Sequence, residues 1–213
     1  MPEQRSVTNV KVLLVNGSPH EKGCTHTALC EVAGALNECG VQTEIFWIGK
    51  GPVQGCVACG GCARTGACVY KGDPCNALIA KMREADGLVV GSPVYYAGPN
   101  GALCALLDRA FYACGRDMAD KPAACVVSCR RGGASAAFDR LNKYFTISRM
   151  PVVSSQYWNS VHGNRPEETR QDLEGLQVMR VLGRQMAYLL RSMREAGLPK
   201  PECEPRVSTN FIR

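Results

Sequence analysis

The sequence lacks any apolar run of about 20 residues, the length that a membrane-spanning helix requires. Its first residues also lack the basic and then apolar layout of a secretory signal peptide. Histidine is scarce, and His20, His26 and His162 do not have the spacing of a metal-binding motif. These absences exclude an integral membrane protein and a histidine-ligated metal site, and we expect a cytoplasmic protein.

No dense basic region is present either. The net charge is +6, and the 25 Lys and Arg residues are interspersed with 19 Asp and Glu residues. Nucleic-acid-binding proteins usually present a more concentrated basic face, so we expect no nucleic-acid partner and favour small anionic ligands. A hydrophobic content of 46% in 213 residues suffices for one large core. We expect a single domain over 1–213, with a cysteine-rich loop at 49–75 and a C-terminal helix and tail at 166–213.

Two common phosphate-binding motifs are missing after the first apolar segment, Val10–Val15. The chain continues there with Asn16-Gly17-Ser18-Pro19. No Gly-Lys-Ser/Thr follows, which disfavours nucleoside triphosphate hydrolysis. No Gly-x-Gly-x-x-Gly follows either, which disfavours a dinucleotide-binding Rossmann site.

Apolar segments of strand length alternate with segments of helical periodicity along the chain. This alternation predicts a parallel sheet covered by helices on both faces, in the flavodoxin-like doubly wound order 2-1-3-4-5. The predicted fold class is therefore α/β with a five-stranded parallel sheet. The predicted strands are Val10–Val15, Val41–Ile48, Gly87–Gly91, Ala123–Ser128 and Val152–Tyr157.

The predicted helices fill the segments between these strands. The last one is long and carries apolar residues on more than one face, because Val178 and Val181 lie off its main stripe. We therefore predict that it packs against another subunit in a homodimer or homotetramer, with packing on its own sheet as the alternative. The helices are predicted at Thr25–Glu38, from Asp73-Pro74 onward, at Asn100–Gly115, at Gly133–Ser148 and at Pro166–Gly197.

In a doubly wound fold, ligands bind at the carboxyl ends of the strands, which directs attention to three loops. The first loop opens a helix, whose free N–H groups and positive end form an anion pocket. Its hydroxyl groups suit a single monophosphate, although an ordinary strand-to-helix turn is the alternative. The candidate ligand-binding residues of this loop and helix start are Ser18, His20, Gly23, Cys24, Thr25 and Thr27.

The other two loops are candidates for the flat ring of a ligand. The second has a stiff aromatic edge that suits a heteroaromatic ring, with two tyrosines filling the edge of the core as the alternative. The third has glycines that allow close backbone approach and arginines that can offset negative charge, with a solvated arginine pair as the alternative. The candidates are Pro93, Val94, Tyr95, Tyr96 and Gly98 in the second loop, and Cys129, Arg130, Arg131, Gly132 and Gly133 in the third.

Thirteen cysteines are a large number for a chain of this length. Four of them form the pattern Cys56-x-x-Cys59-x-x-Cys62-x5-Cys68, whose first three match the opening of a ferredoxin-type run that wraps a [4Fe–4S] cluster. Four thiolates also satisfy tetrahedral zinc by number, and a reduced loop without metal is the third alternative. Cys75 lies just beyond, as a substitute ligand or a residue without a role in the site.

Taken together, these segments resemble the iron–sulfur flavoprotein branch of the NAD(P)H-dependent FMN reductase family, which is flavodoxin-like. The resemblance covers about residues 10–112, although His20 and Cys24 stand where the family usually has Arg and Asn. It implies FMN held by its phosphate in the first loop and by its ring between the second and third loops, near a subunit interface. The matching motifs are Gly17-Ser18-Pro19 with Gly23-x-Thr25, the cysteine pattern, Ala85-Asp86-Gly87, Gly91-Ser92-Pro93-Val94-Tyr95-Tyr96 and Leu106-Leu107-Asp108-Arg109.

We therefore predict an FMN-dependent oxidoreductase that uses NAD(P)H as co-substrate or takes electrons from a low-potential donor. The electrons pass to a quinone or another small acceptor, or through a [4Fe–4S] cluster held by Cys56, Cys59, Cys62 and Cys68. The flavin carries the chemistry, so no catalytic side chain is assigned. The alternatives are an electron-transfer flavoprotein without substrate turnover, and a binding module stabilised by zinc.

Overall fold

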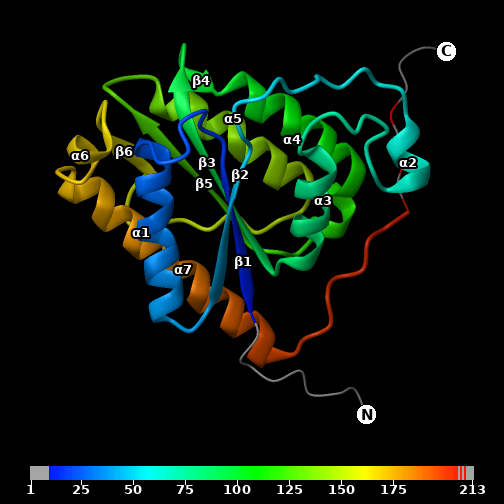
Figure 1. Cartoon of the computed structure of the whole chain (residues 1–213). Coiled ribbons are helices and arrows are strands. Elements are labelled where there is room, and N and C mark those ends of the chain that lie inside the picture. Colours follow the sequence, from blue (N-terminus) through cyan, green and yellow to red (C-terminus); the bar gives the residue numbers. More distant parts are fainter. Residues whose placement is uncertain (1–9, 206, 208, 210–213) are drawn as a thin grey trace.

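A computed structural model describes residues 10–205, 207 and 209, so the end of the predicted C-terminal tail lies outside the described residues. Its centre is a parallel sheet with the order β2-β1-β3-β5-β6, and the short β4 pairs antiparallel with β3 (Figure 1). This order corresponds to the predicted 2-1-3-4-5 and confirms the flavodoxin-like fold, because β4 is only a hairpin extension. The strands are β1 Lys11–Asn16, β2 Gln42–Trp47, β3 Gly87–Tyr95, β4 Gly98–Pro99, β5 Ala123–Cys129 and β6 Ser160–His162.

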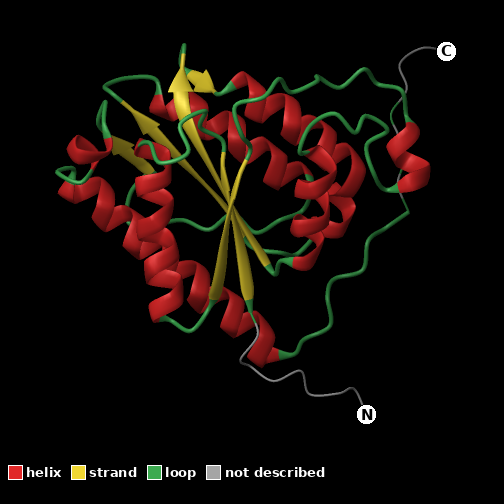
Figure 2. Ribbon diagram, viewed as in Figure 1, coloured by secondary structure: helices red, strands yellow, loops and turns green. Residues whose placement is uncertain are grey.

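Helices cover both faces of the sheet (Figure 2). Along β1, Leu13 and Val15 point into one core while Val12 and Leu14 point into the other, as the two-residue repeat of a strand requires. The first core lies under α3 (Cys75–Glu84), α4 (Gly101–Cys114) and α5 (Ala134–Ile147), and the second lies under α1 (Cys24–Glu38) and α7 (Leu173–Ala196).

The predicted fifth strand at Val152–Tyr157 is wrong. That segment makes only an isolated bridge between Val152 and Ala123, and the edge strand β6 begins at Ser160. Between them the Asn159 side chain donates a hydrogen bond to the carbonyl of Cys125 over 3.1 Å. A side chain thus replaces part of the strand pairing, and the chain returns to the sheet later than its apolar pattern indicates.

The predicted continuous helix at Pro166–Gly197 is also wrong, because it is divided into α6 (Pro166–Thr169) and α7. The break is specified by Asp172, whose carboxylate caps α7 by accepting from the Gly175 N–H at 2.9 Å. The same carboxylate accepts from the backbone N–H of His162 at 2.6 Å. Asp172 therefore starts α7 and ties the beginning of this helix to the end of β6.

The apolar stripe of α7 packs inside its own chain. Leu176, Met179, Leu182 and Met186 are buried against α1 and the sheet, and Val178 is buried with them. The packing of this helix thus follows the alternative, and the stripe no longer supports an oligomer, whose existence stays a prediction. Within the described residues, no helix combines the length and the apolar character needed to cross a bilayer.

Two short helical elements lie in loops on the face of the sheet that α3 covers. A short helix, α2 (Gly61–Thr65), lies in the cysteine-rich loop and contacts α4. A 3-10 turn, η1 (Gly115–Met118), follows α4 directly and leads the chain toward β5. Figure 1 shows α2 at the periphery of the molecule, on the side of the sheet that α3 and α4 cover.

Candidate functional site

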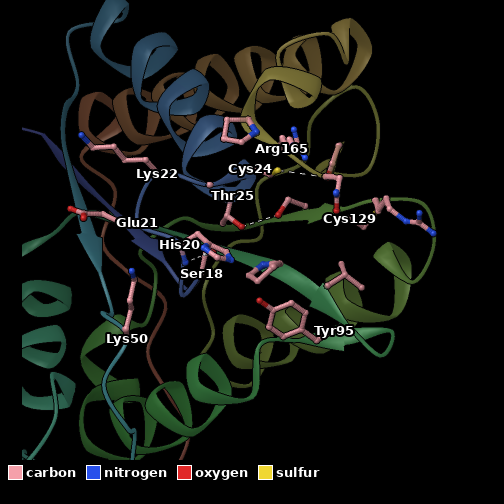
Figure 3. A pocket seen from close by; sticks show the side chains of 18 residues that line it. Ser18, His20, Glu21, Lys22, Cys24, Thr25, Lys50, Tyr95, Cys129 and Arg165 are labelled. Carbon is pink, nitrogen blue, oxygen red and sulfur yellow. Dashed lines mark hydrogen bonds between the residues drawn. The ribbon is translucent and has the colours of Figure 1, made fainter.

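A cavity of about 610 Å³ opens at the carboxyl ends of β1, β3, β5 and β6, where a doubly wound sheet binds its ligand (Figure 3). Its volume suits a ligand of the size of a mononucleotide. Its wall is formed by Ser18, His20, Glu21, Lys22, Gly23, Cys24, Thr25, Lys50, Pro93, Val94, Tyr95, Ser128, Cys129, Arg130, Gly163, Asn164, Arg165 and Pro166.

Local hydrogen bonds shape the loop between β1 and α1. The side chain of buried Asn16 accepts from the Ser18 N–H at 3.1 Å and donates to the carbonyl of Glu21 at 2.9 Å. The Ser18 hydroxyl accepts from the His20 N–H at 3.1 Å. These Asx- and Ser-type turns fold the loop back on itself before the helix begins. Asn16, which the sequence analysis left without a role, is the residue that organises the loop.

The first turn of α1 has no side-chain cap. Gly23 occupies the capping position, and the first bond within the helix runs from the Thr27 N–H to the Gly23 carbonyl at 3.0 Å. The N–H groups of Cys24, Thr25 and His26 therefore precede the hydrogen-bonded ladder of the helix. The first turn also contains no acidic residue. An uncapped helix start with a positive dipole end facing a cavity suits a phosphate group.

The side chains around the cavity add positive charge. Lys22, Lys50, Arg130 and Arg165 lie in its wall, opposed by a single acidic residue, Glu21. Basic groups at a concave site attract anionic ligands. The cavity therefore favours a ligand with at least one negatively charged group.

The thiol groups at the cavity lie in unlike surroundings. Burial raises the pKa of the Cys129 thiol, which keeps it neutral near pH 7. The Cys24 thiol lies 3.6 Å from the carbonyl oxygen of Gly163 and so joins α1 to the loop after β6 (Figure 3). A neutral Cys129 thiol favours a contact role for that residue over a nucleophilic one.

Most of the predicted ligand-binding residues come together in this wall. The structure places Ser18, His20, Gly23, Cys24, Thr25, Pro93, Val94, Tyr95, Cys129 and Arg130 there. The others, Thr27, Tyr96, Gly98, Arg131, Gly132 and Gly133, lie outside it.

Three of the residues outside the wall have local structural roles. Thr27 donates its hydroxyl to the Gly23 carbonyl at 3.3 Å, within its own helix. Tyr96 and Ala97 have φ angles of 50° and 59° and form the tight turn of the β3–β4 hairpin, with the Tyr96 side chain fully exposed. Gly133 has a φ of 87°, and a Cβ there would lie 2.8 Å from the Cα of Ala97. The absence of a side chain at Gly133 thus allows the third loop to contact the hairpin.

Sequence reasoning missed the fourth wall segment, Gly163–Pro166, with Arg165. The signal existed, because ligand loops follow the carboxyl ends of strands. Only the loops after the first, third and fourth predicted strands were assigned to the ligand, and the fifth strand was itself misplaced, so the loop after His162 was not considered. Lys50, Glu21, Lys22 and Ser128 were also not predicted, although the last three lie within or beside the first and third loops.

The cysteine segment (residues 49–75) begins at the cavity, since Lys50 lies in its wall, and extends over the side of α4. Cys56 and Cys59 are exposed, Cys62 and Cys68 are half-buried, and all four thiols are free. The type and number of these donors fit an iron–sulfur cluster or zinc. Across residues 10–205, 207 and 209, however, no group of three or more His, Cys, Asp or Glu side chains lies close enough to hold a metal.

Cys75 differs from the four cysteines of the pattern in its burial. It is buried at the start of α3, and burial, as the main cause, raises the pKa of its thiol to about 12. A neutral, fully buried thiol behaves as a small apolar side chain. The structure therefore places Cys75 in the core of the protein.

Known proteins match both the sequence and the fold. An iron–sulfur flavoprotein of Methanocaldococcus jannaschii is 29% identical over 194 residues, which cover 87% of this chain and 100% of that protein. A flavone reductase matches the fold with a TM-score of 0.69 at 16% identity, over 89% of this chain and 66% of that chain. RosB with a bound intermediate matches with a TM-score of 0.67 at 16% identity, over 96% and 94%.

The two structural matches concern the fold, because their sequence identity is low. The sequence match to a family is more extensive and spans β1 to the loop after β6, which includes every residue of the cavity wall except Pro166. Residues 10–165 match the family described as NADPH-dependent FMN reductase, and the chain therefore belongs to this family of flavin oxidoreductases.

Proposed function

We propose that the chain binds FMN in the cavity and transfers electrons from NADPH or NADH to a quinone or another small acceptor. The observation that carries the proposal is the cavity itself, which combines the uncapped start of α1 with basic side chains at the carboxyl ends of the sheet. Membership of the FMN reductase family supports the choice of FMN among phosphorylated ligands of this size.

The phosphate end of the ligand is assigned to the first loop. The N–H groups of the first turn of α1, with the side chains of Ser18 and His20, would bind the phosphate. Lys22 and Arg165 would balance its charge, and the Cys24–Gly163 contact holds the loop of Arg165 close to α1. These residues would bind and orient the phosphate end of the ligand.

The ring end is assigned to the second and third loops. Pro93, Val94 and Tyr95 offer a stiff apolar and aromatic edge on one side, and Cys129 with Arg130 lies on the other. Bound FMN supplies the hydride acceptance and the onward electron transfer. Arg130 would stabilise negative charge on the reduced ring. Hydride transfer requires no general acid–base pair from the chain.

The second part of the proposal concerns Cys56, Cys59, Cys62 and Cys68, which we assign to a [4Fe–4S] cluster. The Methanocaldococcus jannaschii relative is named an iron–sulfur flavoprotein, and four free thiols, two of them exposed, support the assignment here. A cluster would supply one-electron transfer beside the flavin. An electron-transfer flavoprotein without its own small-molecule substrate is the second candidate, favoured by the cysteine segment that begins at the cavity.

Anaerobic purification followed by incubation with FMN tests both parts. We expect about one bound FMN per chain, NADPH- or NADH-dependent reduction of a dye acceptor, and about four iron atoms per chain. A chain that binds no FMN overturns the flavin proposal. Bound FMN with a cluster and without turnover of any dye favours the electron carrier. Zinc in place of iron overturns the cluster assignment.

A further inference from the structure

We propose that Arg109 is a positioning residue that fixes the cysteine segment to α4 and presents Cys68 as its anchored metal ligand. This inference rests on the proposed cluster assignment. It concerns a residue of α4 that lies outside the cavity wall and that no step of the flavin chemistry uses.

The five N–H donors of the Arg109 guanidinium are directed at the cysteine segment. The Nε group donates to the sulfur of Cys68 at 3.2 Å. One terminal nitrogen, Nη1, donates to the carbonyl of Gln54 at 2.9 Å and to the Asp73 carboxylate. The other, Nη2, donates to the same carboxylate at 3.0 Å and to the carbonyl of Tyr70 at 3.5 Å. All five N–H groups of the arginine side chain thus donate to one segment.

Burial makes this arrangement specific. The Arg109 side chain is 2% exposed, and that of Asp73 is 0% exposed. Removing two charges from water is costly, so a buried ion pair is weak evidence for stability and better evidence for a defined geometry. A planar guanidinium can satisfy these acceptors together only in one arrangement, which a lysine cannot reproduce.

Cys68 is held through its backbone as well as its sulfur. The Asn76 side chain, at the start of α3, accepts from the Cys68 N–H at 2.8 Å and donates to the Cys68 carbonyl at 3.0 Å. By contrast, Cys56 and Cys59 are exposed in a stretch without regular structure. Cys68 is therefore the fixed donor of the four, to which a bound cluster would be anchored.

The Nε–H contact has an electronic consequence in addition to its geometric one. Hydrogen bonds to the sulfur ligands of a cluster stabilise its reduced, more negative state and raise its reduction potential. Arg109→Lys keeps the positive charge but loses the fork. In the protein loaded with FMN and reconstituted with iron and sulfide, we expect the cluster potential of this variant to shift to more negative values and the flavin potential to stay unchanged. Equal cluster potentials in both proteins would overturn the sulfur contact.

A second measurement needs no cluster. Trypsin cleaves after Arg64 and Lys71, both inside the cysteine segment. In the metal-free protein with FMN bound, Arg109→Lys should be cut there about tenfold faster, because charged hydrogen bonds that hold the segment are lost. The matched control is Arg140→Lys, which alters another Arg–Asp pair, with Asp108 on the surface. The control should be cut at the rate of the unaltered protein, and equal rates for Arg109→Lys would overturn the anchoring.

Two further outcomes are decisive. If Arg109→Lys fails to bind FMN, Cys68→Ser takes its place, because it leaves the Arg109–Asp73 pair intact. This variant should stay resistant to trypsin and lose its iron, and a full complement of iron would overturn the ligand role of Cys68. If the unaltered protein assembles no cluster, the cluster assignment and the ligand role both fail. The trypsin measurement then decides the anchoring alone.

Discussion

The hydroxyl groups of Thr25 and Ser128 lie 2.8 Å apart and join the first turn of α1 to the end of β5 (Figure 3). Both side chains are buried and belong to the wall of the cavity. The hydrogen bond connects the phosphate end of the proposed site to its third loop across the sheet. The geometry of the cavity therefore depends on a contact that neither loop makes alone.

Thr25→Val should show this dependence. Valine keeps the shape of threonine but cannot hydrogen-bond, so the buried Ser128 hydroxyl loses this partner. We expect a loss of about 1–3 kcal/mol in the free energy of unfolding and weaker FMN binding. Urea denaturation of the FMN-free protein measures the first effect, and fluorescence titration with FMN measures the second.

The double variant Thr25→Val with Ser128→Ala serves as the control. Removing both partners leaves no unsatisfied hydroxyl, so its cost should be smaller than the sum of the two single costs. Simple additivity would show that the two hydroxyl groups do not depend on each other.

Arg165→Gln tests whether the loop after β6 binds the phosphate. The arginine lies in the cavity wall close to the α1 loop. Loss of a charge-assisted contact should raise the dissociation constant for FMN roughly tenfold and leave that for riboflavin, which has no phosphate, unchanged. Arg170→Gln, which changes an exposed arginine outside the wall, is the matched control. An equal loss for both flavins would show that Arg165 acts on the ring or on folding.

The first strand and the first helix could be predicted from the sequence almost to the residue. Val10–Val15 was predicted and Lys11–Asn16 is observed, and Thr25–Glu38 was predicted against Cys24–Glu38. A fully buried strand reads as a continuous apolar run, and an amphipathic helix shows its period, so local chemistry decides both elements. Because both elements were placed correctly, the loop between them could also be predicted as part of the cavity wall.

The fourth wall segment could not be predicted because its position depends on tertiary contacts. Strand β6 has three residues, too few for a recognisable pattern, and it is placed by the side chain of Asn159 and the cap of Asp172. The role of Arg109 is hidden for a similar reason. Arg109 belongs to one of the motifs that the family resemblance uses, but its hydrogen-bond acceptors, from Gln54 to Asp73, lie far from it along the chain.

The close packing of α7 on α1 predicts opposite effects for two helical glycines. A Cβ on Gly183 would lie 2.7 Å from the carbonyl oxygen of Val32 and 2.8 Å from the Cβ of Ala35. Gly183→Ala should therefore lower the free energy of unfolding by about 1–3 kcal/mol through overpacking. Gly34→Ala, at an exposed position with nothing within 4 Å of the added Cβ, should raise it by about 0.5–1 kcal/mol. Thermal melts measure both, and two stabilised variants would contradict the close contact.

The Arg109–Asp73 pair predicts that the free energy of unfolding falls at acid pH. Burial alone would raise the pKa of Asp73, but hydrogen bonds from Arg109 and from the N–H groups of Cys75 and Gln54 outweigh it and hold the pKa below its usual value. A carboxylate with a lowered folded-state pKa contributes stability above its unfolded pKa of about 3.9, and this is lost as the pH falls through the folded value. Asp73→Asn should cost about 3 kcal/mol at pH 7.

The pH profile separates this ionic contribution from packing. Urea denaturation between pH 7 and pH 3 measures the free energy of unfolding of both proteins. That of the unaltered protein should fall in the acid range, so the difference between it and Asp73→Asn should become smaller there. Glu44→Gln is the comparison, because hydrogen bonds from Lys11 and Lys81 also lower the pKa of Glu44, but all three side chains are partly exposed. Its cost should be under about 1 kcal/mol. A difference between the unaltered protein and Asp73→Asn that stays constant down to pH 3 would mean that Asp73 stabilises the segment by shape rather than by charge.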